Sequence, residues 1–346
     1  SSKSSSPISS RNSRSEDMRL DAEAVRDITR GTELITECDE KISFFRFTPE
    51  QAEMYRKYRC EDYCLMTNST ADVRMAFRTD SGCVGFDYEL SFGSHREPAW
   101  FDICVDGALV VHTGSADGKP ETGHIDADLG NGTKVVEICF PWSRAVTISG
   151  FTLDDGAAVV PVRRKYTMIS YGDSITHGYD AEYPSLALSS ALARMLDADN
   201  TNKAIAGDIF FPELLLPEEP ITPDIVTAAY GTNNWNIQDK ESFVRDCRRF
   251  YSALSEKYRS SRIFAVLPIW RDDNDKQTRF GEPFERTADI IREICAPLEN
   301  ITVVGGTRMT PHLDDFYTDG LHPNDKGFCV YAANLYREIA IALRNN

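Results

Sequence analysis

The sequence contains no apolar stretch that approaches the roughly 20 residues that a membrane-spanning helix needs. Basic residues are also scarce, because 38 Lys and Arg stand against 54 Asp and Glu and leave a formal net charge of −16. Such an acidic surface repels phosphate backbones and anionic lipid headgroups. Nucleic acid and membranes are therefore not expected partners, and a neutral or weakly charged small molecule or oligosaccharide fits better. The oligomeric state stays open.

Several short motifs of common enzyme classes are missing as well. The sequence has no G-x-S-x-G, no H-E-x-x-H, no phosphate-binding loop and no G-x-G-x-x-G. These absences argue against the α/β-hydrolase, zincin, kinase and dinucleotide-binding classes. Nothing in the sequence calls for a metal or an organic cofactor, and we expect none.

The nine cysteines do not form a pattern typical of a disulfide framework or a zinc site. Their number is odd, and most lie in apolar runs, as Cys104 and Cys139 do. Cys60 and Cys64 lack the C-x-x-C spacing of a zinc ligand pair. We interpret the cysteines as free thiols in a reducing compartment, which favours the cytoplasm. Secretion would require a signal segment upstream of this sequence, because the Ser-rich residues 1–21 have no apolar core and indicate a disordered tail.

A chain of 346 residues exceeds the usual size of one hydrophobic core, so two domains are expected. The region 22–162 contains short β-like runs separated by turn signals such as Asn131-Gly132. This spacing predicts an antiparallel β-sandwich. One helix should interrupt it after Thr48, where Gln51 completes a capping box. The predicted strands are 42–47, 73–79, 83–92, 100–105, 109–113, 134–140 and 146–153.

The region 163–346 alternates apolar strand-like runs with segments of helical period, which predicts an α/β domain with a parallel sheet covered on both faces. In such sheets the ligand lies beyond the carboxyl ends of the strands. The predicted strands are 167–171, 202–206, 225–230, 263–268 and 301–304, and the predicted helices are 184–196, 241–258, 283–298 and 326–343.

Polar residues that suit acyl transfer follow these strands. Ser174 lies at a strand-to-helix turn, where its hydroxyl can be exposed as a nucleophile. His322 is the candidate base, and Asp319, three residues earlier, can orient its ring. The amides of Ser174 and Gly207 and the carboxamide of Asn233 can donate to a developing oxyanion.

These blocks resemble the GDSL/SGNH hydrolase family in their order and spacing. The resemblance rests on GDSIT at 172–176, Gly207, GTNN at 231–234 and DGLHP at 319–323, and it covers about half the chain. It implies a flavodoxin-like three-layer fold and the hydrolysis of esters, often acetyl or other acyl groups on sugars or lipids. A departure is Asn234, which stands where many relatives have Asp. The two-domain layout is similar to carbohydrate esterases of the acetyl-xylan-esterase kind, which implies a jelly-roll-like sandwich in front.

Three further residues are candidates for binding the substrate: Trp235 and Trp270 as flat walls for a sugar ring, and His177 as a contact to the leaving group. Each has a simpler interpretation as a packed side chain. The expected function is a serine esterase that hydrolyses short acyl esters on a carbohydrate. The alternatives are a lipid esterase or thioesterase and, from another class, a glycan-binding protein with a vestigial hydrolase domain. The first domain could bind glycan or only shape the active site.

Overall fold

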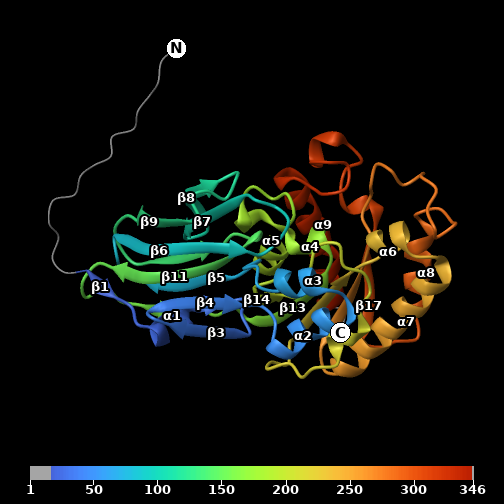
Figure 1. The fold of residues 1–346 in the computed structure, drawn as a ribbon, viewed down its shortest axis with the longest axis horizontal. Helices are drawn as coiled ribbons and strands as arrows, with labels where there is room; N and C mark the ends of the chain where they lie inside the picture. The colour runs from blue at the N-terminus through green and yellow to red at the C-terminus, as the bar shows by residue number, and fades with distance from the viewer. Residues whose placement is uncertain (1–16, 345–346) are drawn as a thin grey trace, which may run out of the picture.

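The computed structural model describes residues 17–344 and divides into a strand-rich first half and an α/β second half (Figure 1). No helix among the described residues is long and apolar enough to cross a membrane. Residues 1–16 of the expected Ser-rich tail lie outside the described part. The prediction that the disordered tail extends to residue 21 is wrong at its C-terminal end. Met18–Arg19 forms a strand (β1) that pairs antiparallel with β11, Arg144–Leu153.

The first half forms two antiparallel sheets, as the sequence predicted. The first sheet has the order β3-β4-β11-β6-β9 with β1 beside β11, and the second has the order β12-β5-β10-β7-β8 with β2 beside β5. The elements are α1 (Ala22–Ile28), β2 (Thr29–Arg30), β3 (Leu34–Cys38), β4 (Lys41–Phe45), α2 (Pro49–Tyr58), α3 (Glu61–Met66), β5 (Arg74–Thr79), β6 (Cys83–Phe92), β7 (Ala99–Val105), β8 (Ala108–Ser115), β9 (Thr122–Asp128), β10 (Lys134–Cys139), β11 and β12 (Val160–Pro161).

Aromatic side chains from both sheets fill the space between them. Phe86 of β6 stacks on Phe151 of β11, and Phe77 of β5 meets the same ring edge-on. These three side chains are fully buried. Sheets that bury one face each in a shared core make a sandwich, so the predicted sandwich architecture is confirmed.

Helix α2 begins where the sequence predicted, with the Thr48–Gln51 capping box formed in both directions. However, α2 and α3 do not pack into the sandwich. Tyr55 of α2 and Cys64 of α3 belong to the buried core of the second half. The predicted boundary between 162 and 163 stays a prediction, but side chains from the first half contribute to the core of the second.

The second half has a sheet of five parallel strands in the order β14-β13-β15-β16-β17, which is the 2-1-3-4-5 order of flavodoxin-like folds. Helix α5 packs against α9, and α7 against α8. The elements are β13 (Tyr166–Gly172), α4 (Ser174–His177), α5 (Leu188–Met195), β14 (Ala198–Asn202), β15 (Ile225–Ala229), α6 (Thr232–Ile237), α7 (Lys240–Lys257), β16 (Arg262–Leu267), α8 (Arg286–Cys295), β17 (Ile301–Gly305) and α9 (Asp325–Arg344), with 3₁₀ turns at Pro184–Leu186, Pro212–Leu215, Thr307–Met309 and Asp314–Phe316.

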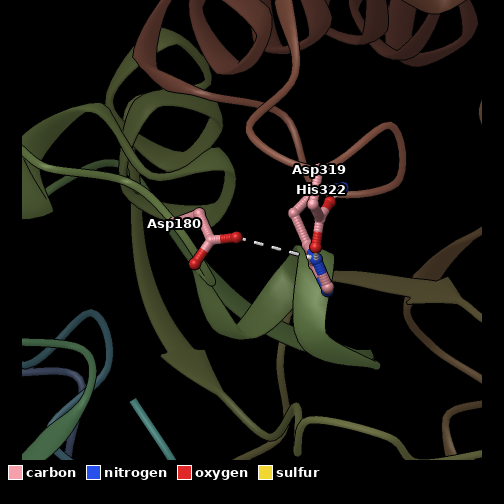
Figure 2. Close-up of side chains that lie close together, drawn as sticks. All are labelled: Asp180, Asp319 and His322. Carbon is pink, nitrogen blue, oxygen red and sulfur yellow. Dashed lines mark hydrogen bonds and ion pairs between the residues drawn. The ribbon is translucent and has the colours of Figure 1, made fainter. Parts of the chain in front are cut away.

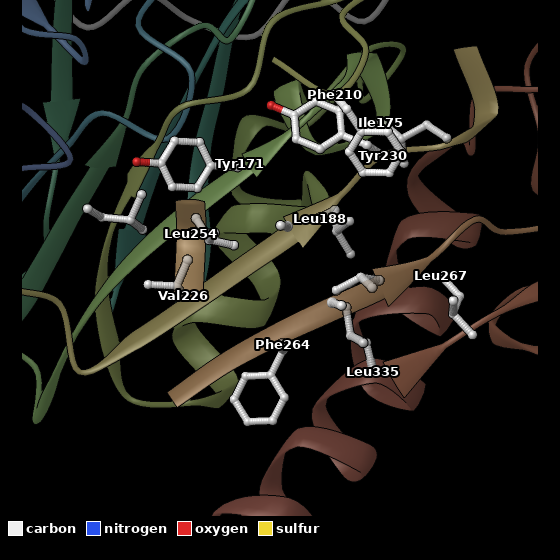
Figure 3. Close-up of a cluster of buried hydrophobic side chains, with 14 of the residues drawn as sticks. Tyr171, Ile175, Leu188, Phe210, Val226, Tyr230, Leu254, Phe264, Leu267 and Leu335 are labelled. Atoms are coloured by element: carbon white, nitrogen blue, oxygen red, sulfur yellow. The ribbon is translucent and has the colours of Figure 1, made fainter. Parts of the chain in front are cut away.

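Successive residues of the central strands are buried, so the sheet is covered on both faces, as Figure 3 shows for Val226, Phe264 and their neighbours. One predicted strand is displaced. Residues 202–206 were expected in the sheet, but β14 ends at Asn202. The Asn202 side chain accepts a bond from the amide of Ala204 and turns the chain there. Apolar residues 204–206 are buried in the loop instead.

Candidate active site

Ser174 is the first residue of α4, directly beyond the carboxyl end of β13. Asp173 caps this helix by accepting a bond of 3.0 Å from the amide of Ile175. Gly178 ends it after a single turn, with a φ of 109° that favours glycine. The first amides of a helix have no carbonyl partner one turn back. The turn therefore presents the hydroxyl and the amide of Ser174 together.

His322 lies on the loop before α9, and its Nε2 is 2.8 Å from Ser174 Oγ. Its Nδ1 is 2.8 Å from Asp319 Oδ2. The other oxygen of Asp319 accepts bonds from the amides of Leu321 and His322 at 3.1 and 2.8 Å. These amides fix the carboxylate, so the ring donates from Nδ1 and leaves Nε2 to accept from the serine hydroxyl.

The environment of Asp319 favours its ionised form. Partial burial raises its pKa, but the bonds from the amide and the ring of His322 outweigh burial, so the pKa lies below its ordinary value. An ionised carboxylate beside Nδ1 stabilises the imidazolium that forms when the base accepts a proton. The structure thus brings together the three residues proposed from sequence as nucleophile, base and acid.

The two proposed oxyanion donors follow β14 and β15. Gly207 has a φ of 77°, and Asn233 lies on α6. Asn233 Nδ2 donates one hydrogen bond, of 3.0 Å, to the carbonyl of Asp208. A carboxamide nitrogen carries two hydrogens, so this bond orients the side chain and leaves a second hydrogen. The roles of both residues stay predictions.

Helices α2 and α3 of the first half hold the loop that carries Gly207. Tyr63 donates to the carbonyl of Gly207 at 3.1 Å, and Tyr55 donates to Asp208 at 2.9 Å. Arg59 lies 3.4 Å from Asp208 and over the ring of Phe211. The sequence did not single out these residues.

Two buried carboxyl groups flank the nucleophile turn. Burial raises the pKa of Asp173 to about 7 and that of Asp208 to about 6, against the bonds from the amides of Ile175 and Ile209. Asp173 braces the turn through a backbone amide.

A second carboxylate, which the sequence analysis missed, lies beside His322. Asp180 Oδ2 is 3.7 Å from His322 Nδ1, and Asp180 reaches the ring from a different segment of the chain than Asp319 does (Figure 2). Arg96, from the loop between β6 and β7, donates to Asp180 at 3.0 and 3.5 Å and lies 3.9 Å from Asp319. The only available signal was that Asp180 follows the Ser174 motif closely. The position of Arg96 depends on how the two halves pack.

Asp180, Asp319 and His322 are also the one group among the described residues whose spacing could hold a metal ion. The guanidinium of Arg96 already supplies a positive charge to both carboxylates. Carboxylates that are already paired with a cationic side chain do not require a metal ion to balance their charge. We interpret the group as an ion network.

His177 cannot contact a leaving group in this arrangement, which corrects the sequence-based expectation. Its side chain is fully buried. Nε2 is 2.9 Å from Ser69 Oγ, and Nδ1 accepts from the amide of Ala206 at 3.2 Å. Burial, with the nearby Arg46, lowers the pKa of His177 well below its ordinary value. His177 therefore stays neutral and ties α4 to the first half.

The proposed role of Trp235 as a sugar platform is likewise wrong. Its ring is fully buried, meets Phe284 edge-on and donates from the indole nitrogen to the carbonyl of Glu282. Trp270 is different, because it is partly exposed and stacks on His312 at 5.2 Å. It also contacts Tyr317, which pairs with Pro323 beside His322. Trp270 stays a candidate wall of the substrate site.

The fold and the site have the form of a carboxylic ester hydrolase. Residues 170–328 match the model of the GDSL-like lipase/acylhydrolase family. The match includes Ser174, Gly207, Asn233, Asp319 and His322. A comparison with curated proteins found no significant sequence match.

Solved structures share both halves of the fold. The salicylyl-acyltransferase SsfX3 from a tetracycline biosynthetic pathway is 22% identical with a TM-score of 0.74, and the alignment covers 91% of this chain and 94% of that one. A family two carbohydrate esterase from Cellvibrio japonicus is 14% identical with a TM-score of 0.65, over 94% and 97%. The acetyl xylan esterase Est2A from Butyrivibrio proteoclasticus is 14% identical with a TM-score of 0.64, over 96% and 98%. At these identities the likeness concerns the fold.

Proposed function

We propose that this chain is a serine esterase that removes short acyl groups, acetyl above all, from a carbohydrate. The observation that carries the proposal is the continuous chain of hydrogen bonds from Ser174 through His322 to Asp319, with 2.8 Å at each step. The family match supports acyl hydrolysis. The two-half architecture shared with acetyl xylan esterase supports a carbohydrate ester.

The mechanism follows from the direction of these hydrogen bonds. His322 Nε2 takes the proton of Ser174 Oγ while Oγ bonds to the ester carbonyl carbon. The oxyanion lies among the amides of Ser174 and Gly207 and the carboxamide of Asn233. His322 returns the proton to the departing alcohol, which leaves an acyl-enzyme. A water molecule, deprotonated by His322, then releases the acid and restores the serine.

The same acyl-enzyme can pass its acyl group to an alcohol instead of water, so acyl transfer is a second candidate function. The observation that favours it is the extent of the likeness to the salicylyl-acyltransferase, which spans both halves. The two functions differ only in what attacks the acyl-enzyme, and an added alcohol separates them.

The experiment compares hydrolysis of p-nitrophenyl acetate, butyrate and octanoate by the wild type and by Ser174→Ala. We expect the wild type to prefer acetate and the variant to be inactive, and acetylated xylo-oligosaccharides to be deacetylated. Preference for octanoate would replace the proposal by a lipid esterase. Ester formation with an added alcohol, in place of acid release, would favour the transferase. Wild-type protein that turns over no ester but binds glycan would contradict both.

A further inference from the structure

The side chain of Asp180 is directed at the catalytic histidine although the backbone there adopts a disfavoured conformation. Asp180 follows α4 with a φ of 69°, a region that residues other than glycine rarely adopt and that Asp and Asn tolerate best. Its side chain is 13% exposed, and Oδ2 lies 3.7 Å from His322 Nδ1. Figure 2 shows Asp180 approaching the ring from the segment after α4, whereas Asp319 comes from the same loop as His322.

The first half supplies the charge that holds Asp180 in place. Arg96 Nε donates to Asp180 Oδ1 at 3.0 Å, and Nη2 reaches Oδ2 at 3.5 Å. The same Nη2 lies 3.9 Å from Asp319 Oδ2. The guanidinium also lies over the ring of Tyr179, at 5.3 Å from its centroid, and that ring is 5.8 Å from the ring of His322.

This arrangement reduces the electrostatic repulsion between the two carboxylates beside His322. Two carboxylates within reach of one ring nitrogen repel each other, and this cost rises in a partly buried site. A planar guanidinium with several donors can contact both carboxylates at once and offset one of their two charges, which a flexible ammonium does less well. The groups that face His322 are therefore Asp319 from its own loop, Asp180 from the segment after α4, and Arg96 from the first half.

We propose that Asp180 and Arg96 are positioning residues for His322, which rests on the proposed function of Ser174 and His322. Asp180 is a second carboxylate that stabilises the protonated ring and shares this role with Asp319. Arg96 fixes Asp180 and offsets one of the two negative charges of Asp180 and Asp319. The first half of the chain thereby contributes to the catalytic base itself.

The test is a double-mutant cycle with Asp180→Asn and Asp319→Ala, because Asn tolerates the αL backbone and has nearly the same shape as Asp. The readouts are the rate at which a small fluorophosphonate labels Ser174, followed by mass spectrometry, and the kcat/KM for p-nitrophenyl acetate. We expect Asp180→Asn to lower the labelling rate and kcat/KM about fivefold in the wild type. In the Asp319→Ala background, the loss caused by the same substitution should be at least about ten times larger. An equal loss in both backgrounds would mean that Asp180 does not share the role of Asp319 at His322, and would overturn the proposal.

The pH profile of the labelling rate tests the charges separately. Asp180→Asn removes a negative charge near the ring, so the acidic limb of the profile should move to lower pH. Arg96→Met removes a positive charge, so the limb should move to higher pH, and Arg96→Lys should restore part of the shift. Movement of both variants in one direction, or of neither, contradicts the proposal. Arg56→Met, which removes an exposed arginine paired with Glu53 and Glu61, serves as the control.

Failure of the proposed function would look different. A wild type that is labelled at Ser174 but hydrolyses no ester would contradict the esterase, while the labelling cycle would still test Asp180. A wild type that is not labelled at any pH would overturn both, because no activated serine would be present. Thermal unfolding of each variant distinguishes a lost fold from a lost contact, and Arg96→Lys provides the measurement should Arg96→Met fail to fold.

Discussion

The hydroxyl of Tyr63 donates a hydrogen bond of 3.1 Å to the carbonyl oxygen of Gly207. Tyr63 lies on α3 of the first half, and Gly207 lies on the loop after β14 of the second. A Cβ added at Gly207 would lie 3.2 Å from the same hydroxyl. The two halves therefore meet at the proposed oxyanion donor, and the first half also contacts the proposed catalytic residues through Arg96.

The first prediction concerns this contact. Tyr63→Phe removes the donor and frees the peptide that follows Gly207, so the oxyanion donors should be less well positioned. We expect kcat for p-nitrophenyl acetate to fall by about tenfold, the size of one hydrogen bond, with little change in KM. Tyr58→Phe, on the exposed end of α2, should have no effect. An unchanged kcat in Tyr63→Phe would show that the loop is held by Tyr55 and Arg59 without it.

The second prediction concerns the oxyanion itself. Asn233→Ala should lower kcat by about 10²–10³, because a donor that acts in the transition state is lost. Asn236→Ala provides a matched control, since Asn236 lies on the same short helix and is exposed. Circular dichroism and thermal unfolding check that α6 is retained. Near-wild-type activity of Asn233→Ala would remove Asn233 from the mechanism.

The sequence was informative where the chemistry follows strand ends. The alternation of strands and helices predicted the parallel sheet, and short motifs next to those strands singled out Ser174, Asp319 and His322, which the structure brings together. These three residues can be found from the sequence because each lies in a loop or turn that the alternation of strands and helices indicates.

The same reasoning failed where a contact depends on tertiary packing, either between the halves or within one of them. His177 was expected to contact the substrate because it follows Ser174 closely. In the structure, loops of the first half cover α4, and the His177 side chain is buried against Ser69 and Trp142. Trp235 is buried by Phe284, which is distant in sequence. Arg96 reaches Asp180 from a loop of the sandwich that carries no motif. No local pattern encodes these contacts.

The third prediction concerns the cohesion of the halves. Arg46 is fully buried and donates to Ser69 Oγ and Ser69 O at 2.6 Å each and to the carbonyl of Ala204 at 3.2 Å. Burial lowers its pKa to about 9, although Tyr55 and Asp72 favour the charged form.

Arg46→Met would leave these acceptors buried without a donor. We expect the free energy of unfolding to fall by about 3 kcal/mol or more in chemical denaturation. Arg78→Met, at an exposed position of β5, should change it little. Equal stability of the two variants would show that the carbonyls find other partners, and that Arg46 does not hold the halves together.

The last prediction concerns the pH dependence of stability. Burial raises the pKa of Asp173 from 3.8 to about 7, against the opposing bond from the amide of Ile175. A raised pKa means that the folded protein binds this proton more tightly than the unfolded chain does. The stability contribution of Asp173 is therefore fully present below the unfolded pKa and is lost as the pH rises through the folded pKa.

Asp173→Asn keeps an acceptor for the amide of Ile175 but cannot ionise. The difference in unfolding free energy between this variant and the wild type should therefore shift in favour of the variant between about pH 4 and pH 7, by an amount on the order of a few kcal/mol. Denaturation of both proteins at pH 4, 5.5 and 7 measures this shift. Asp208 titrates in the same window and its charge raises the pKa of Asp173, so the shift reports the pair of carboxyl groups. A difference that does not change with pH would mean that Asp173 is ionised throughout, stabilised by Arg271 and the amides of its turn.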